Sequence, residues 1–237
     1  TGVIEALWQA RAYLKVTHTP EIGPGGIRMR TVTFLLALLL AGSPGAAAAA
    51  PAFPGAVGPA AGTPGGRGGR ILRVTTLAAS GPGSLRAAIE TRGPRIIVFE
   101  VGGVVDLART TIDIREPYLT VAGQTAPSPG VTLIRGGIDI RTHDVVLRHI
   151  RIRPGADGDA KRSGWESDAI STIAARNVIV DHCSLSWAPD ENLSASGPRF
   201  TGATPEAWRA GTSRNISFSY NLLAEGLADS THPKGEH

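Results

Sequence analysis

The stretch Arg176–Ser194 reads RNVIVDHCSLSWAPDENLS, and its pattern decides the fold. Apolar residues alternate with polar ones at Val178, Val180, Cys183 and Leu185. Such alternation is typical of short, half-buried β-strands. The acidic residues Asp181, Asp190 and Glu191 stand where these strands would end. The stretch therefore combines a regular strand pattern with a concentration of carboxylates.

Two other stretches repeat this pattern, His143–Ile152 before it and Arg214–Leu223 after it. Each begins with a polar pair, continues as an alternating strand, passes a bulky polar residue and ends in a second short strand. Asp144, Asn177 and Asn215 are equivalent positions, and the second interval between them is longer than the first. Self-similarity on this scale indicates stacked coils that bury their apolar faces against one another. The unequal intervals predict loops of different length on one side.

Composition supports an all-β chain. The 237 residues include 30 glycines and 17 prolines, and only 5% are aromatic. No helical pattern interrupts Arg95–Arg153, and strands this short fit a sandwich, a propeller or a parallel β-helix. The repeat favours the parallel β-helix. A turn followed by a short helix is expected over Ser80–Glu90, with Ser84 as the cap. This helix is expected to cover the open end of the coils with Leu85, Ala88 and Ile89.

Charge and cysteine content limit the possible partners. The net charge of +4 is not gathered into a basic run, so no nucleic-acid partner is expected. A polyanionic sugar is compatible with this charge. The single cysteine, Cys183, excludes an intramolecular disulfide. It is expected to be a small buried residue that faces the core.

The N-terminal part of the chain, up to Gly69, differs from the rest. Residues 29–50 combine a basic start, an apolar run at Thr31–Ala41 and an alanine-rich end, which predicts a secretory signal peptide. The run is shorter than the roughly 20 residues of a membrane span, so export without a membrane anchor is expected. Residues 1–28 are interpreted as upstream sequence translated by mistake. Residues 51–69, rich in Pro, Gly and Ala, are expected to form a disordered or extended linker.

The β-helix domain is expected to cover residues 70–237, and its abrupt end suggests that it is C-terminally incomplete. Within it, Glu166 and Asp168 precede one strand, and Asp190 and Glu191 precede the next. Coils stacked about 4.8 Å apart would bring such positions within reach of one ion. Ligands that offer only oxygen suit Ca²⁺. The alternative, solvated loop acids, stays open at this point, and Asp157 and Asp159 are expected to be solvated.

These segments resemble a known family. The motif Asn177–Ser184, with Glu166–Asp168 before it and Asp190–Ser194 after it, is similar to the secreted pectate lyases of polysaccharide lyase family one. The segments Gly81–Ile89 and Val121–Thr125 are similar to bacterial members. The resemblance covers about Ile71 to His237.

The resemblance implies a right-handed parallel β-helix with a Ca²⁺ site that cleaves α-1,4-linked galacturonan by β-elimination. Glu166, Asp168 and Asp190 match three of the family's acidic metal ligands. The fourth position falls on Ser194, which removes a negative charge. Glu191 could compensate, but as the neighbour of Asp190 on a strand it is expected to point to the opposite face.

Other roles also follow from the resemblance. Lys234 matches a lysine that binds the substrate carboxylate. No residue matches the general-base arginine, which is expected beyond His237, so this chain alone is expected to be inactive. Asp181 and His182 match a family motif and are expected to be structural.

Two alternatives to a secreted, monomeric lyase remain. A non-catalytic β-helix that binds acidic polysaccharide is favoured by Ser194. A polygalacturonase-like glycoside hydrolase would need paired acids spaced for its reaction. The Asn-Thr-Asp and Arg-Ile-Lys motifs of that hydrolase family are absent from the sequence.

Overall fold

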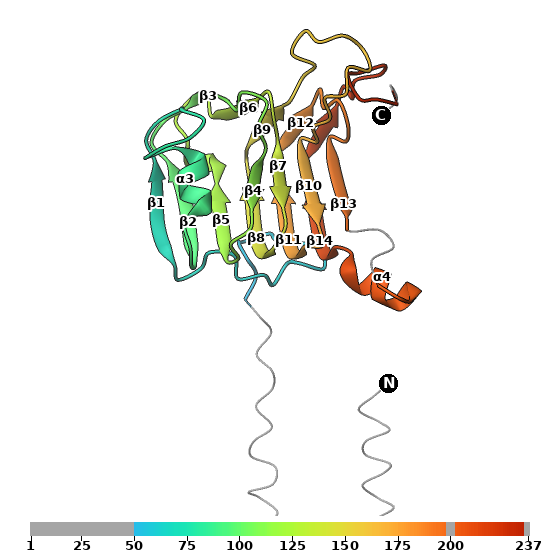
Figure 1. Cartoon of the computed structure of the whole chain (residues 1–237). Coiled ribbons are helices and arrows are strands. Elements are labelled where there is room, and N and C mark those ends of the chain that lie inside the picture. The colour runs from blue at the N-terminus through green and yellow to red at the C-terminus, as the bar shows by residue number, and fades with distance from the viewer. Residues whose placement is uncertain (1–49, 198–201, 235–237) are drawn as a thin grey trace, which may run out of the picture. The chain divides into compact units, whose positions relative to one another are not determined.

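Three parallel sheets wrap around one core in the computed structural model, which describes residues 50–197 and 202–234 (Figure 1). Sheet A contains, in spatial order, β1 (Arg70–Val74), β2 (Arg95–Phe99), β5 (Leu119–Ala122), β8 (His143–Arg148), β11 (Arg176–Asp181) and β14 (Arg214–Ser219). Sheet B contains β15 (Leu222–Ala224), β12 (Ser184–Ser186), β9 (Arg151–Arg153), β6 (Val131–Ile134) and β3 (Gly103–Asp106). Sheet C contains β13 (Leu193–Ser196), β10 (Ile170–Ile173), β7 (Ile138–Ile140) and β4 (Ile112–Ile114).

The chain visits the sheets in the order A, B, C and then returns to A one strand further along. The strands pair in parallel, and each complete coil adds one strand to every sheet. This arrangement confirms the right-handed parallel β-helix predicted from the sequence. The predicted signal peptide at residues 29–50 and the upstream residues 1–28 lie outside the described residues, apart from Ala50.

The register of sheet A reproduces the sequence repeat. Arg176 pairs with His143 on one side and with Arg214 on the other, so the first residues of the three repeated stretches lie side by side. Asp144, Asn177 and Asn215 occupy the same place in successive coils, each with a positive φ of 52–56°. Their side chains form a ladder in which Asn215 donates to Asn177, and Asn177 donates to Asp144, both at 3.2 Å. Short polar side chains tolerate this left-handed conformation. The hydrogen bonds of the ladder join equivalent positions of successive coils and so stabilise this register.

The core is built from aliphatic residues that point inward from all three sheets. Val178, Val180 and Leu185 are fully buried, as the alternation predicted. Cys183 is also buried, and burial raises the pKa of its thiol to about 11. This cysteine therefore acts as a small apolar core residue.

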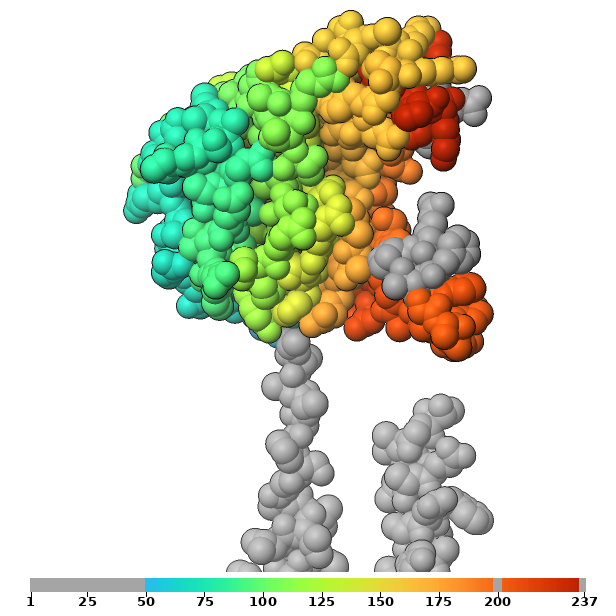
Figure 2. Space-filling view, viewed as in Figure 1, coloured from blue at the N-terminus to red at the C-terminus, as the bar shows by residue number. Residues whose placement is uncertain are grey.

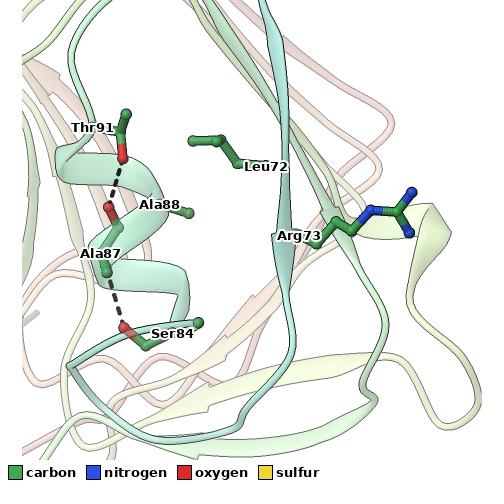
Figure 3. A pocket seen from close by; sticks show the side chains of 7 residues that line it. Leu72, Arg73, Ser84, Ala87, Ala88 and Thr91 are labelled. Atoms are coloured by element: carbon green, nitrogen blue, oxygen red, sulfur yellow. Dashed lines mark hydrogen bonds between the residues drawn. The ribbon is translucent and has the colours of Figure 1, made fainter.

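The helix α3 (Leu85–Glu90) covers the first coils, as expected. Leu85, Ala88 and Ile89 are buried against the core, and the Ser84 side chain accepts a hydrogen bond from the Ala87 N–H (Figure 3). A shallow pocket beside the helix is lined by Leu72, Arg73, Gly83, Ser84, Ala87, Ala88 and Thr91. The helix shields apolar residues that a bare end of the coil stack would expose.

Residues 51–69 pack on the outer face of sheet A, which differs from the linker that their composition predicted. Ala60 is 2% exposed and forms a small apolar cluster with Val146 and Ile179. The backbone N–H of Gly66 donates to Thr120 Oγ1 at 2.9 Å. A side chain on Gly66 would overlap the carbonyl oxygen of Arg95, so glycine permits this close approach. The glycines that suggested disorder serve here to bring backbone onto the sheet.

A short helix that was not predicted, α4 (Pro205–Gly211), lies between β13 and β14. Thr204 caps it by accepting from the Ala207 N–H, and Pro205 occupies its first turn. The 3-10 turn η1 (Gly123–Thr125) was also not predicted. No residue of α4 is buried, so it lacks the apolar face that reveals a helix in sequence, and η1 is a single turn of three residues.

Candidate functional site

Carboxylates from two successive coils meet where the chain enters sheet C. Asp168 lies two residues before β10, and Asp190 and Glu191 precede β13. The β10–β13 register pairs Ile170 with Leu193. Continued backward by two residues, this register places Asp168 beside Glu191, and the Glu191 N–H donates to Asp168 Oδ1 at 3.2 Å. The parallel pairing of the coils therefore brings these acids together.

Two overlapping groups of side chains lie here, and together they are called the acidic corner. One oxygen each from Asp168, Asp190 and Glu191 lie within 4.8 Å of one another. Glu166, Asp190 and His232 form a second such group, so Asp190 belongs to both. The structure thus brings the predicted residues Glu166, Asp168 and Asp190 to one corner, with Asp190 between the other two.

The expectation that Glu191 points to the opposite face is wrong. Asp190 and Glu191 lie in a bend between β12 and β13, and β13 begins only at Leu193. The alternation of side chains that holds within a strand does not apply in a bend. Glu191 therefore joins Asp168 and Asp190 and supplies a third carboxylate.

Ser194 lies beside Asp168, at the fourth position implied by the resemblance. Its hydroxyl is 3.0 Å from Asp168 Oδ2 and 2.8 Å from Ser171 Oγ, the residue opposite it in the register. Burial raises the pKa of Asp168, while the hydrogen bond from Ser194 acts in the opposite direction. A divalent cation nearby would favour the ionised form of this carboxyl.

His232 was missed by the sequence analysis. Its ring is buried, and Nε2 lies 3.8 Å from Glu166 Oε1 and 4.0 Å from Asp190 Oδ2. The segment that carries it is anchored by Ser230, which donates to the Pro189 carbonyl, and by Thr231, which donates to the Trp165 carbonyl, both at 2.7 Å. No periodic pattern marks such a segment, so its place could not be read from sequence.

Lys234 lies two residues beyond His232, and its backbone N–H donates to His232 Nδ1 at 3.2 Å. Its side chain is exposed. The structure therefore places this predicted substrate-binding residue on the segment that borders the acidic corner. In Figure 2 the C-terminal segment, in red, abuts the loop between β9 and β10, in yellow-orange.

The loop between β9 and β10 is held by ion pairs, contrary to the expectation that Asp157 and Asp159 are only solvated. Asp157 pairs with Arg135 at 3.2 Å, and Asp159 pairs with Arg109. The guanidinium of Arg109 also lies 4.6 Å from the ring centre of Trp165. The hydrogen bond from Arg109 lowers the pKa of Asp159. These contacts hold the loop that leads to Glu166 and Asp168.

Known proteins are similar to this chain in sequence. The chain is 38% identical over 163 residues to "Probable pectate lyase C" from Emericella nidulans and to the protein of that name from Aspergillus terreus. Each match covers 68% of this chain. The chain is a relative of the pectate lyases. This finding confirms the resemblance read from the motifs.

Further comparisons set the scope of this relationship. "Probable pectate lyase 18" from Solanum lycopersicum is 30% identical over 128 residues, which is 48% of this chain. The chain spans about one third of the length of the fungal pectate lyases it matches, 33% in each case. No family model matches the chain.

A solved structure supports the architecture. The crystal structure of Jun a 1, the major allergen from cedar pollen, aligns with a TM-score of 0.51 and 20% identity, covering 72% of this chain and 58% of the allergen chain. At this identity the likeness concerns the fold alone.

Within residues 50–197 and 202–234, no helix has the length and apolar character needed to cross a membrane.

Asp181 and His182, in the motif that carries the resemblance to pectate lyases, lie at a different turn, between sheets A and B. Asp181 is 1% exposed and accepts hydrogen bonds from Ser219 Oγ, His182 Nδ1 and Arg148 Nε at 2.7, 2.7 and 2.8 Å. Burial alone would raise the pKa of Asp181, but these hydrogen bonds outweigh it and hold the pKa below its ordinary value. This buried network ties three coils together.

Proposed function

We propose that the protein is a secreted, Ca²⁺-dependent pectate lyase that cleaves α-1,4-galacturonan by β-elimination. The observation that carries the proposal is the meeting of Asp168, Asp190 and Glu191 on successive coils of a chain related to pectate lyases. Three carboxylates this close repel one another, and a bound cation offsets that repulsion. We further propose that the protein acts as a monomer without nucleic-acid or membrane partners.

The donor set fits Ca²⁺, which prefers six to eight oxygen ligands from carboxylates, carbonyls and water. Asp168, Asp190 and Glu191 would hold the ion, with Glu166 and the Ser194 hydroxyl at its border. His232 stands on the Glu166 side of Asp190, so the oxygen-only group is the better candidate for the ion.

The reaction explains why such groups are needed. Removal of the proton at C5 of a galacturonate residue places negative charge on the neighbouring carboxylate. Bound Ca²⁺ would stabilise that charge electrostatically. Lys234, exposed beside the acidic corner, would contact the same carboxylate of the substrate. No residue of this chain matches the general-base arginine.

A second candidate function is supported by Ser194. This residue supplies a neutral hydroxyl where the resemblance implies a carboxylate, which reduces the negative charge at the corner by one. A weaker ion site would suit a β-helix that binds acidic polysaccharide without cleaving it.

An activity assay separates these functions. The product of the complete gene is incubated with polygalacturonate, with Ca²⁺ or with a chelator, and the ultraviolet absorbance of the unsaturated product is followed. We expect absorbance to rise with Ca²⁺ and to stay flat with chelator. The present chain alone should give no product, because it contains no matched general base. New reducing ends without absorbance would indicate a hydrolase, and retention on the polysaccharide without cleavage would indicate the binding protein.

A further inference from the structure

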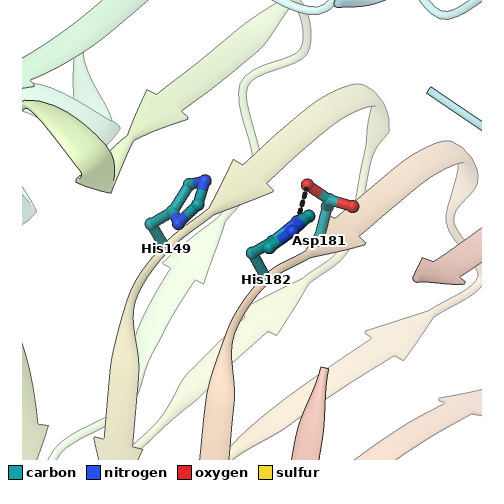
Figure 4. Close-up of side chains that lie close together, drawn as sticks. All are labelled: His149, Asp181 and His182. Atoms are coloured by element: carbon teal, nitrogen blue, oxygen red, sulfur yellow. Dashed lines mark hydrogen bonds and ion pairs between the residues drawn. The ribbon is translucent and has the colours of Figure 1, made fainter. Parts of the chain in front are cut away.

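Two imidazole rings lie face to face on successive coils, at the turn between sheets A and B. His149 follows β8 and His182 follows β11, and the register pairs the residues just before them, Arg148 and Asp181. The ring centres are 4.9 Å apart with an angle of 24° between the planes (Figure 4). The ring centre of Tyr220, at the same place in the next coil, lies 5.1 Å from that of His182. The coil repeat therefore sets the spacing of the two histidines.

The contact with Asp181 fixes the tautomer of His182. His182 Nδ1 lies 2.7 Å from Asp181 Oδ2, and the same carboxylate accepts from Ser219 and pairs with Arg148 (Figure 4). An ionised carboxylate only accepts, so we assign the proton to His182 Nδ1. In the neutral ring the Nε2 lone pair is then available. A carboxylate that orients a histidine in this way is a recurrent feature of metal sites.

His149 is also suited to bind a metal. Its ring stacks on that of His182 and is partly exposed, so one of its nitrogens can reach an ion near the pair. The side chain of His182 is 45% exposed, so the pair can be reached from solvent.

We propose that His149 and His182 form a site for a divalent transition metal such as Zn²⁺ or Cu²⁺. One nitrogen of each histidine and one oxygen of Asp181 lie within 4.8 Å of one another. Imidazole is a preferred ligand of Zn²⁺ and Cu²⁺. Two nitrogens that share a metal at ~2.0–2.1 Å lie roughly 3–4 Å apart, and their lone pairs lie in the ring planes. The stacked rings must therefore turn away from parallel to bind one ion together.

The site would be chemically distinct from the acidic corner, since it offers nitrogen where the corner offers carboxylate oxygen. Asp181 already accepts from Ser219, Arg148 and His182, so its role is to orient His182 while water fills the other positions on the metal. A metal held by both rings would link two successive coils. Since it would bind the folded chain and not the unfolded one, a higher metal concentration would increase the stability of the fold.

The test uses Cu²⁺ as the probe on the present chain. Electron paramagnetic resonance should show two imidazole nitrogens at one bound equivalent. In a competition titration with a chromophoric chelator, His149→Gln and His182→Gln should each weaken binding at least tenfold. Two matched controls, His143→Gln and His232→Gln, should bind as the parent chain does. Circular dichroism verifies that each variant is folded.

Three results would overturn the proposal: no imidazole or one imidazole nitrogen in the parent spectrum, unchanged affinity in folded His149→Gln or His182→Gln, or loss of binding in His232→Gln alone. The parent spectrum requires no substitution. It therefore decides the matter even if a variant fails to fold.

Discussion

Asp190→Asn is expected to weaken Ca²⁺ binding at least tenfold, since calcium affinity depends on the number of charged ligands. Asp190 belongs to both groups at the acidic corner, so its carboxylate is the one that no neighbour can replace. The asparagine keeps the shape and one carbonyl oxygen, which confines the change to charge. Isothermal titration calorimetry of the parent and variant chains with CaCl₂ provides the measurement.

Two further variants control this experiment. Asp157→Asn removes an acid that pairs with Arg135 in the loop between β9 and β10, so Ca²⁺ affinity should stay the same. Ser194→Asp adds a carboxylate next to Asp168 and should raise the affinity. Equal affinities in the parent and Asp190→Asn would mean that the corner is not the calcium site.

Asp181→Asn is expected to lower the free energy of unfolding by about 3–5 kcal/mol, the usual cost of breaking a buried charge pair. The Asp181 carboxylate is 1% exposed and pairs with Arg148, whose side chain is 17% exposed. The variant leaves the guanidinium without its counter-charge and gives Ser219 and His182 a weaker acceptor. Urea unfolding followed by circular dichroism measures the change.

Asp159→Asn is the matched control for stability. Its pair with Arg109 lies on a loop, with side chains 35% and 31% exposed, and water screens such pairs, so they add little to stability. If Asp181→Asn cost no more than Asp159→Asn, the turn between sheets A and B would not be the electrostatic anchor that the hydrogen bonds indicate.

The coil stack could be predicted because, in a parallel β-helix, the residues that pair between successive coils stand at the same place in each repeat of the sequence. The positions Asp144, Asn177 and Asn215 that define the repeat are the ones that form the polar ladder. Buried positions such as Val178 and Val180 followed from strand alternation for the same reason. Local pattern and tertiary structure coincide here, since each coil packs only on its neighbours.

Other features depended on long-range contacts that no local pattern encodes. Residues 51–69 look like a linker by composition, yet Thr63 donates to Asp144 at 3.0 Å and Ala60 donates from its backbone to Ser217. Likewise, Glu191 was assigned to the wrong face because the bend before β13 was read as strand. His232 reaches the corner only through the fold of the C-terminal segment around Trp165 and Pro189.

The most direct test of the calcium proposal is an anomalous difference map from crystals of the present chain grown with saturating Ca²⁺. The account predicts a peak among the carboxylates of Asp168, Asp190 and Glu191. A map with no peak at this corner, or with peaks only elsewhere, would contradict it.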